Sequence, residues 1–182
     1  MKNIIHIYGA SGSGTSTLGR KICGELGYKL MDTDDYFWLP TNPKYTLKRN
    51  TEERLGMMKR DISEAKNVVI SGSLVGWGNE LIPFFTLAVR LETTTNIRIA
   101  RLKQREKEHF GARIDIDGDM YENHQKFIDW AKSYDTGGLD MRSKLEHDEW
   151  QKLLQCKIVV LNGANDLNMN FEIIHEELNK FW

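Results

Sequence analysis

The sequence of 182 residues has little cysteine and almost no net charge, and both facts limit what the protein can be. Cys23 and Cys156 each lie in or beside an apolar stretch, so we expect two buried thiols rather than a disulfide or a metal pair. The net charge of −1 gives no reason to expect nucleic-acid binding. No apolar run approaches 18 residues, so the sequence predicts no membrane-spanning helix.

Proline and low-complexity sequence are also scarce. The chain has three prolines, and no repeat or low-complexity linker divides it. Its 40% hydrophobic and 28% charged residues are typical of a globular protein, and its length suits one domain with a full core. We therefore expect a single domain over residues 1–182. Because the sequence leads straight into an apolar run, we expect no signal peptide and a cytoplasmic location.

The chain is organised around residues 3–20, NIIHIYGASGSGTSTLGR. The apolar run at 4–8 predicts a buried parallel strand, and the small residues at 9–14 predict a loop. A pattern of apolar residues at helical spacing follows from residue 18. Strand, Gly-rich loop and helix in this order form the layout of a phosphate-binding P-loop. Glycines let backbone N–H groups converge on an anion, and the helix N-terminus adds positive charge there.

This loop predicts binding of ATP with Mg²⁺. We assign to the nucleotide the loop residues Gly9, Ser11, Gly12, Ser13, Gly14, Thr15, Ser16 and Thr17. Ser16 stands where the motif has its Mg²⁺ ligand. The pattern G-x-x-x-x-G-K-S/T is broken at one position, because Thr15 replaces the expected lysine. The alternative interpretation is a flexible Gly/Ser turn, but the length and flanks of the loop favour the phosphate site.

The segments GASGSGTSTLG and ELGYKLMDTDDYFW together resemble the nucleoside-monophosphate-kinase-like P-loop kinases. Within that group the chain is similar to shikimate and gluconate kinases, which carry Asp-x-Asp after the second strand. It also resembles bacterial topology modulation proteins, which share an Asp-Asp-x-Phe-Trp signature. Archaeal-type cytidylate kinases likewise have Thr after the final loop glycine, so the resemblance implies that losing the lysine is compatible with function. The resemblance covers about residues 3–38, and beyond them only the layout is shared.

The rest of the chain alternates between short apolar runs and helical patterns. Beyond the first strand we expect strands at 28–31, 68–70, 87–91 and 157–161, and beyond the first helix we expect helices at about 52–65, 79–85, 96–109, 120–133, 142–155 and 170–181. This alternation predicts an α/β fold, a three-layer sandwich in which helices cover both faces of a five-stranded parallel sheet. The insert at about 96–140 exceeds what a crossover needs, and the resemblance implies that it forms a helical lid over the phosphates.

Polar residues follow several predicted strands, at the edge where parallel sheets bind ligands. After the second strand come Asp32 and Asp34, whose carboxylates can hold Mg²⁺ through water and orient or deprotonate an acceptor hydroxyl. The resemblance assigns Asp32 to the metal and Asp34 to the acceptor; a helix cap or solvated turn is the alternative. Ser71 ends the third strand, where many P-loop enzymes have an acidic residue. We expect Asn162, in the turn after the last strand, to border the adenine.

Segment 98–113 concentrates positive charge. It holds six basic and two acidic residues, so six minus two gives a local charge of +4 in a chain of net −1. Phosphoryl transfer needs cations over the transferring group, and lid arginines supply them in the kinases that the chain resembles. The candidates are Arg101, Arg105 and Arg113, joined by Arg142 from the returning helix. A solvated basic face is the alternative.

These features predict an ATP-dependent kinase that transfers the γ-phosphate to a hydroxyl or phosphate of a small molecule, such as a nucleotide or a sugar acid. The alternative is a nucleotide-binding regulator without efficient phosphotransfer, which Thr15 and Ser71 favour. The aspartate pair and the arginines favour the enzyme, because a protein that only binds nucleotide needs neither. The identity of the acceptor and the oligomeric state are not encoded in any motif of this sequence.

Overall fold

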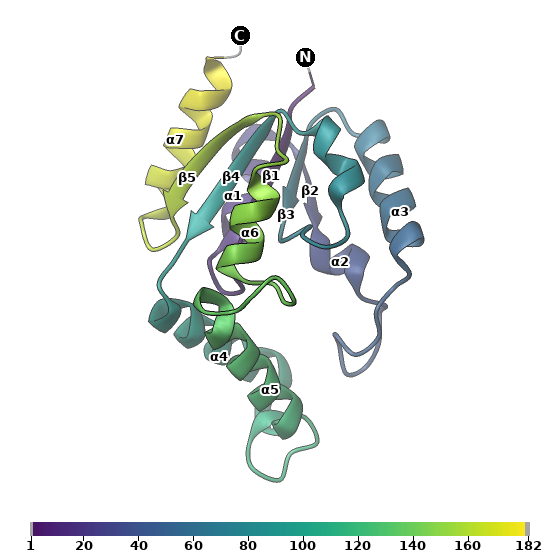
Figure 1. Ribbon diagram of the computed structural model, residues 1–182, viewed down its shortest axis with the longest axis vertical. Helices are drawn as coiled ribbons and strands as arrows, with labels where there is room; N and C mark the ends of the chain where they lie inside the picture. The colour runs from purple at the N-terminus through teal and green to yellow at the C-terminus, as the bar shows by residue number, and fades with distance from the viewer. Residues whose placement is uncertain (1, 181–182) are drawn as a thin grey trace.

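A five-stranded parallel sheet forms the centre of the computed structural model, which describes residues 2–180 (Figure 1). The strands are β1 (Ile4–Gly9), β2 (Lys29–Asp32), β3 (Val68–Ser71), β4 (Leu87–Glu92) and β5 (Lys157–Asn162). Their order across the sheet is β2-β3-β1-β4-β5, so the strand that leads into the P-loop lies in the middle. Every pair of neighbouring strands is parallel, which confirms the predicted α/β fold.

Helices pack on both faces of this sheet because the side chains of β1 alternate between two apolar cores. Ile5 and Ile7 pack in the core beneath α1 (Thr15–Leu26) and α7 (Leu167–Asn179). On the other face, Ile4 and Tyr8 belong to a second core. That core is covered by α3 (Thr51–Glu64), η1 (Asn79–Phe84) and α6 (Lys144–Gln151). The central strand is therefore buried on both sides, as its continuous apolar run indicates.

The predicted insert forms a helical projection beyond the carboxyl ends of the strands, in the lower part of Figure 1. Its elements are α4 (Thr95–Phe110), η2 (Gly111–Ile114), α5 (Tyr121–Lys132) and η3 (Ser133–Asp135). A small apolar cluster of Leu102, Ile128 and Ala131 holds α4 against α5. The start of β1 and the end of α7 lie at the opposite end of the molecule from this projection (Figure 1).

One element that the sequence pattern did not predict follows directly after β2. The sequence analysis gave a helix cap or solvated turn as the alternative for this segment, and residues Thr33–Phe37 form the short helix α2. Asp32 begins this helix by accepting a hydrogen bond from the backbone N–H of Asp34. A helix of five residues is too short to show a helical period in the sequence, so only its N-cap could have indicated it.

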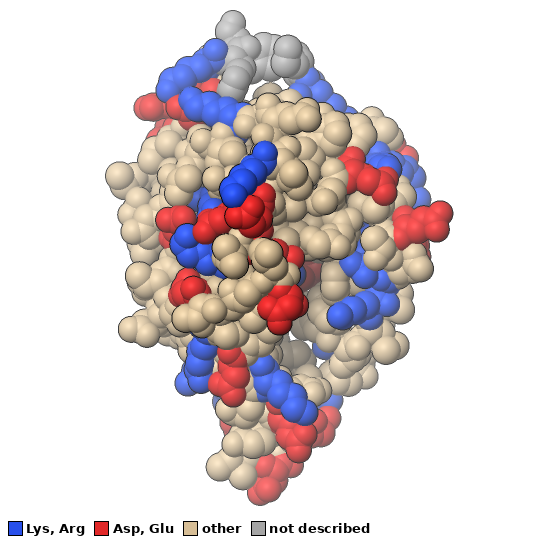
Figure 2. Space-filling view, viewed as in Figure 1, with Lys and Arg blue, Asp and Glu red and all other residues tan. Residues whose placement is uncertain are grey.

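On the displayed face of the molecule, charges of both signs lie side by side (Figure 2). Figure 2 shows basic and acidic side chains interspersed over the displayed face, and it shows a hollow between the projection and the body of the molecule. Among residues 2–180, no helix is both long enough and apolar enough to cross a lipid bilayer.

Candidate active site

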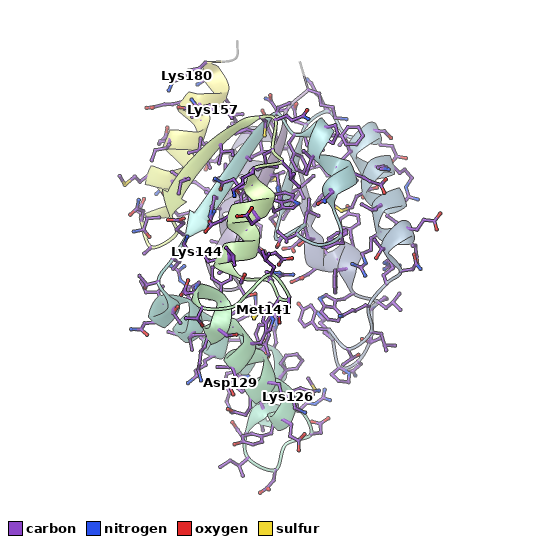
Figure 3. All side chains as sticks on the ribbon, viewed as in Figure 1. Lys126, Asp129, Met141, Lys144, Lys157 and Lys180 are labelled. Atoms are coloured by element: carbon purple, nitrogen blue, oxygen red, sulfur yellow. The ribbon has the colours of Figure 1, made fainter. Side chains whose placement is uncertain are left out.

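Two cavities lie at the carboxyl edge of the sheet, where β1, β2 and β3 end in Gly9, Asp32 and Ser71. The larger has a volume of about 960 Å³ and the smaller about 420 Å³. Met141 and Lys126, both labelled in Figure 3, line the larger cavity on the side of the α4–α5 projection. Both cavities are bordered by Gly12, Thr15, Ser16 and Arg105. The P-loop therefore separates two spaces that meet at its tip.

The P-loop itself has the geometry of an anion site. Helix α1 begins at Thr15, and its N-cap is Gly14, which adopts a φ of 105° and provides no capping side chain. The first N–H groups of α1 are therefore not bonded by a cap side chain and can serve an anion. Gly9 and Ser11 border the larger cavity, and Ser13 and Thr17 the smaller one. The structure thus distributes the eight predicted loop residues around both spaces.

Asp32 and Ser16 are adjacent at the base of the loop. The Ser16 hydroxyl donates to one carboxylate oxygen of Asp32 at 2.6 Å, while the other oxygen accepts from the backbone N–H of Asp34 at 3.2 Å. Asp32 is therefore a helix cap and a partner of the P-loop at once. These hard oxygen donors fit Mg²⁺. Among residues 2–180 no cluster of three or more metal-ligating side chains forms, so phosphate oxygens and water would complete the coordination.

Asp34 faces the larger cavity from the start of α2. Asp34 is exposed on the cavity wall, but the protein atoms packed around its carboxyl raise the pKa of that group, and the neighbouring charge of Asp32 raises it further. The positive charges of Arg142 and Arg105 act in the opposite direction. A carboxylate whose pKa lies above the ordinary range, between two guanidinium groups, is suited to accept a proton from a hydroxyl.

The predicted arginines occupy three different positions. Arg105 borders both cavities, and Arg142 borders the larger one with its guanidinium 5.5 Å from the ring of Trp130. Arg101 borders the smaller cavity, where it donates to the backbone oxygens of Ser13 at 3.3 Å and Gly163 at 3.0 Å. Arg113 lies outside both linings and pairs with Asp119 at 2.6 Å at the tip of the projection. The structure therefore gathers all but Arg113 at the cavities.

The turn after β5 borders the smaller cavity, as the sequence analysis expected, but through different residues. Gly163 and Asn165 line the cavity, whereas the expected residue, Asn162, does not. The Asn162 side chain accepts from the backbone N–H of Ala164 at 2.8 Å and so shapes the turn. Asn170 of α7, which also lines this cavity, has a buried side-chain oxygen without a hydrogen-bond partner.

Arg54 of α3 is a site residue that the sequence analysis missed. Its side chain lines the larger cavity although the residue is only 6% exposed, and its guanidinium lies 4.0 Å from the ring of Phe37 and 5.1 Å from that of Trp77. Burial lowers its pKa; among residues 2–180 no carboxylate forms an ion pair with it, and its Nε donates to the backbone carbonyl of Arg49 at 2.8 Å. Met58 follows four residues later on the buried face. An arginine within an apolar stripe was the available signal.

Aromatic side chains form much of the wall of the larger cavity. Its aromatic lining residues are Phe37, Trp38, Tyr45, Trp77, Phe110, Phe127 and Trp130. Phe37 and Trp38 belong to the aromatic run 36–38, whose remaining member, Tyr36, packs into the core and donates its hydroxyl to Asp61. The cavity therefore offers flat apolar surfaces together with the cations of Arg54, Arg105 and Arg142.

A scan against models of known protein families gives no match. Among curated proteins, the chain is 37% identical over 168 residues to "Uncharacterized protein YqaC" of Bacillus subtilis (strain 168), with 92% of this chain and 93% of that protein covered.

Several solved structures with a similar fold are kinases of small molecules. Shikimate kinase from Bacteroides thetaiotaomicron superposes with a TM-score of 0.60 at 16% identity, over 97% of this chain and 98% of that chain. Deoxyadenosine kinase from M. mycoides superposes with a TM-score of 0.52 at 17% identity, over 98% of this chain and 100% of that chain. At these identities the likeness shows the fold alone, and that fold is the P-loop kinase fold which the sequence resemblance implied.

Proposed function

The chain belongs to the family of the Bacillus subtilis protein YqaC, and from its site we propose that it is an ATP-dependent kinase of a small anionic molecule. The observation that carries this proposal is the meeting of two cavities at Thr15, Ser16 and Arg105. The smaller cavity takes the nucleoside, and the phosphates run along the P-loop to the junction. The larger cavity takes the acceptor, which therefore meets the γ-phosphate where Asp34 and two arginines face it.

In this proposal the residues of the junction have separate tasks. Ser16 and Asp32 hold Mg²⁺, which neutralises charge on the phosphate oxygens. Asp34 accepts the proton of the acceptor hydroxyl while the hydroxyl oxygen forms a bond to the γ-phosphorus and the bond from that phosphorus to the ADP oxygen breaks. An acceptor phosphate has no such proton to give. Arg105 and Arg142 stabilise the charge on the transferring group. The raised pKa of Asp34 favours its role, because a base is most effective when its pKa approaches the working pH.

The larger cavity also supports a class of acceptor. Arg54 is a buried cation between two aromatic rings, and the free energy cost of burying it falls when an anion pairs with it. The aromatic walls favour a flat or cyclic body. We therefore propose an acceptor that joins a ring to a carboxylate or phosphate, such as a nucleoside monophosphate or a cyclic carboxylic acid.

The test is an acceptor screen with ATP labelled at the γ-phosphate. The panel consists of matched pairs: each nucleoside monophosphate with its nucleoside, and each cyclic carboxylic acid with its amide. We expect labelled product only from anionic members, and where the accepting group is a hydroxyl we expect Asp34→Asn to slow transfer by roughly 10²-fold or more. Transfer to the neutral partners at equal rate would contradict the role of Arg54.

A nucleotide-binding regulator remains the second candidate, because two observations favour it. Thr15 supplies no charge, and β3 ends not in an acidic residue but in Ser71, which is fully buried and whose hydroxyl has no hydrogen-bond partner within the described residues 2–180. A regulator would bind ATP with Mg²⁺ in calorimetry and yield no labelled product with any acceptor. That combined result would replace the kinase proposal with the regulator.

A further inference from the structure

Arg98, at the start of α4, is a buried arginine that the mechanism above does not use. It is 0% exposed, and it belongs to the lining of neither cavity. All five N–H groups of its guanidinium have an acceptor. Nε donates to the Thr93 carbonyl at 3.1 Å, Nη1 to the carbonyls of Ala131 at 3.1 Å and Ser11 at 3.5 Å, and Nη2 to the Thr95 hydroxyl at 2.9 Å and the Asp135 carboxylate at 3.2 Å. Such a fork of five donors is particular to arginine.

The acceptors of Arg98 come from different parts of the fold. Ser11 belongs to the P-loop, whereas Ala131 and Asp135 belong to the end of the α4–α5 projection. The backbone of α4 also packs tightly on the loop, since a Cβ on Gly12 would lie 2.6 Å from the carbonyl oxygen of Arg98. Arg98 therefore connects the predicted lid directly to the nucleotide loop.

Arg101, one helical turn later, contacts the next two peptides of the same loop. Its Nη1 lies 3.5 Å from the carbonyl oxygen of Gly12 and 3.3 Å from that of Ser13. Together the two guanidinium groups bind three consecutive P-loop carbonyls, those of residues 11, 12 and 13. We call Arg98 and Arg101, with these three carbonyls, the carbonyl brace.

The brace has a physical consequence for anion binding. In a P-loop the backbone N–H groups serve the phosphates. A cation bonded to a peptide carbonyl polarises that peptide, and polarised groups in one network strengthen each other's hydrogen bonds. The charge of Arg101, together with the part of the Arg98 charge that Asp135 does not offset, also raises the electrostatic potential of the loop. Thr15 brings no charge of its own to this site.

We propose that the carbonyl brace supplies, through the backbone of the P-loop, the positive charge and the fixed loop geometry that a lysine at position 15 would otherwise supply. Arg98 and Arg101 are thus positioning residues for the phosphates. This inference rests on the proposed nucleotide site; it adds Arg98, which reaches the ligand only through the loop, and it gives Arg101 a role through the loop as well.

The first test is calorimetric titration with two probes, ATP with Mg²⁺ and inorganic tripolyphosphate with Mg²⁺. Arg98→Lys keeps the charge but offers three donors in place of five, and Arg101→Ala removes one charge. We expect each variant to bind both probes about tenfold more weakly, the scale of one hydrogen bond to a charged group. The matched control is Lys103→Ala, which removes an exposed charge from the same helix outside both cavity linings and should leave both affinities unchanged.

The second test separates the brace from a merely structural role by the sign of its effect. Asp135→Asn leaves Arg98 and the loop in place but removes the carboxylate that neutralises the guanidinium at 3.2 Å. The brace predicts roughly two- to threefold tighter tripolyphosphate binding, because the loop gains net positive charge, together with a lower Tm. A purely structural role predicts a lower Tm with equal or weaker binding.

A third measurement tests whether the carbonyl brace takes over the role of a lysine at position 15. In the Thr15→Lys background the loss caused by Arg101→Ala should shrink, because two sources of the same charge overlap and their effects are not additive. An equal loss of affinity from Arg101→Ala in both backgrounds would show that the brace does not take over the role of the lysine.

The outcomes distinguish this inference from the proposal on which it rests. A wild-type protein that binds neither probe contradicts the nucleotide site itself. A wild type that binds both probes, with Arg98→Lys and Asp135→Asn unchanged, overturns the brace alone. A loss of affinity in Arg101→Ala alone also overturns the brace. Arg101 borders the smaller cavity, so it can act on the ligand by direct contact. If Arg98→Lys does not fold, the sign of the Asp135→Asn effect decides.

Discussion

At the scale of single residues, Asp32 and Asp34 show how one short segment can serve two ligands. Asp32 points its carboxylate back to Ser16 and caps α2, and this cap places Asp34 at the start of a helix that faces the larger cavity. The two aspartates have different partners because Asp32 is the N-cap of α2, and the side chain of an N-cap residue turns towards the helix N-terminus. Asp35, the next residue, lies outside both cavity linings.

Asp34→Asn should lower turnover of the acceptor by roughly 10²-fold or more, the scale of a lost general base, while ATP affinity persists. Because only the deprotonated carboxylate accepts a proton, wild-type turnover should fall with falling pH at a pKa above the ordinary range of aspartate. Steady-state kinetics against pH measure both effects. Asp35→Asn is the matched control, and equal losses in the two variants would remove Asp34 from the mechanism.

Arg54→Met should raise the KM for an anionic acceptor by about 100-fold, as expected for a lost ion pair of some 2–3 kcal/mol in a partly desolvated site. The KM for ATP should not change, because Arg54 borders only the larger cavity. Thermal unfolding should show a Tm close to that of the wild type, because removing a buried cation that has no carboxylate partner among residues 2–180 offsets the loss of its hydrogen bond to the Arg49 carbonyl. Arg60→Met, on the exposed face of the same helix, is the control. An unchanged acceptor KM would show that the anion binds elsewhere.

At the scale of elements, helix caps explain which boundaries the sequence could predict. Asn50 accepts from the backbone N–H of Glu52 and begins α3 at Thr51, within a residue of the expected start. Ser143 and Asp166 cap α6 and α7 in the same way. These two caps place α6 at residue 144 instead of 142 and α7 at residue 167 instead of 170, because capping begins a helix earlier or later than the apolar pattern alone indicates. The expected end of α7, residue 181, lies outside the described chain.

The α4–α5 projection already reaches across the mouth of the larger cavity. Arg113 at its tip lies 3.4 Å from the side chain of Asn42, in the loop between α2 and α3. Its own apolar cluster is small compared with the two cores of the sheet. Beyond the base that Arg98 and Arg101 bond to the P-loop, the projection is held by few apolar contacts, and this outer part is expected to open at low free-energy cost.

We predict that residues 96–140 close over bound nucleotide as a lid. Hydrogen exchange should show increased protection of this segment when a nonhydrolysable ATP analogue with Mg²⁺ is added, because closure removes its backbone from solvent. The core strands β1 and β3 provide the internal reference, since they are buried with or without ligand. Equal protection of the segment in both states would contradict closure.

At the scale of the whole molecule, the two cavities differ in how well the sequence could predict the residues that line them. Most of the P-loop side is one contiguous segment, so its motif and its flanking periodicity predicted it. The acceptor side is assembled from α2, α3, the segment after β3, and the lid. Arg54 and Trp77 meet there only because those elements converge in space, and no local pattern encodes such a meeting. The sheet order has the same origin in long-range packing.

Two buried histidines join the sheet to α6 and to the base of the lid. His6 and His147 are both 0% exposed, and His147 bridges the Ser73 hydroxyl at 2.9 Å and the Tyr134 hydroxyl at 2.7 Å. Burial lowers the pKa of His6 to about 4 and that of His147 to about 3, and the positive charges of Arg142 and Arg90 also act on His147. Both rings are therefore neutral in the folded protein well below the pH at which they protonate in the unfolded chain.

Stability should consequently fall as the pH drops from 6.5 towards 4. In this window the unfolded chain binds protons that the folded protein excludes, so the free energy of unfolding decreases with decreasing pH. At pH 5 the loss is about 2 kcal/mol for each histidine, from the ordinary value near 6.5. Urea unfolding at pH 5 and pH 8 measures it, and in His147→Gln the difference between the two pH values should be smaller. Identical pH dependence in the variant would show that His147 is not the group excluded from protonation.

The start of β1 and the end of α7 lie at the end of the molecule opposite the lid, so neither approaches the mouth of a cavity (Figure 1). A protein tethered to a sensor surface through either end would present its binding sites to the flowing solution. Dissociation constants measured on the immobilised protein should therefore equal those in free solution. The binding experiments described above can thus be performed on a chip with microgram amounts of each variant.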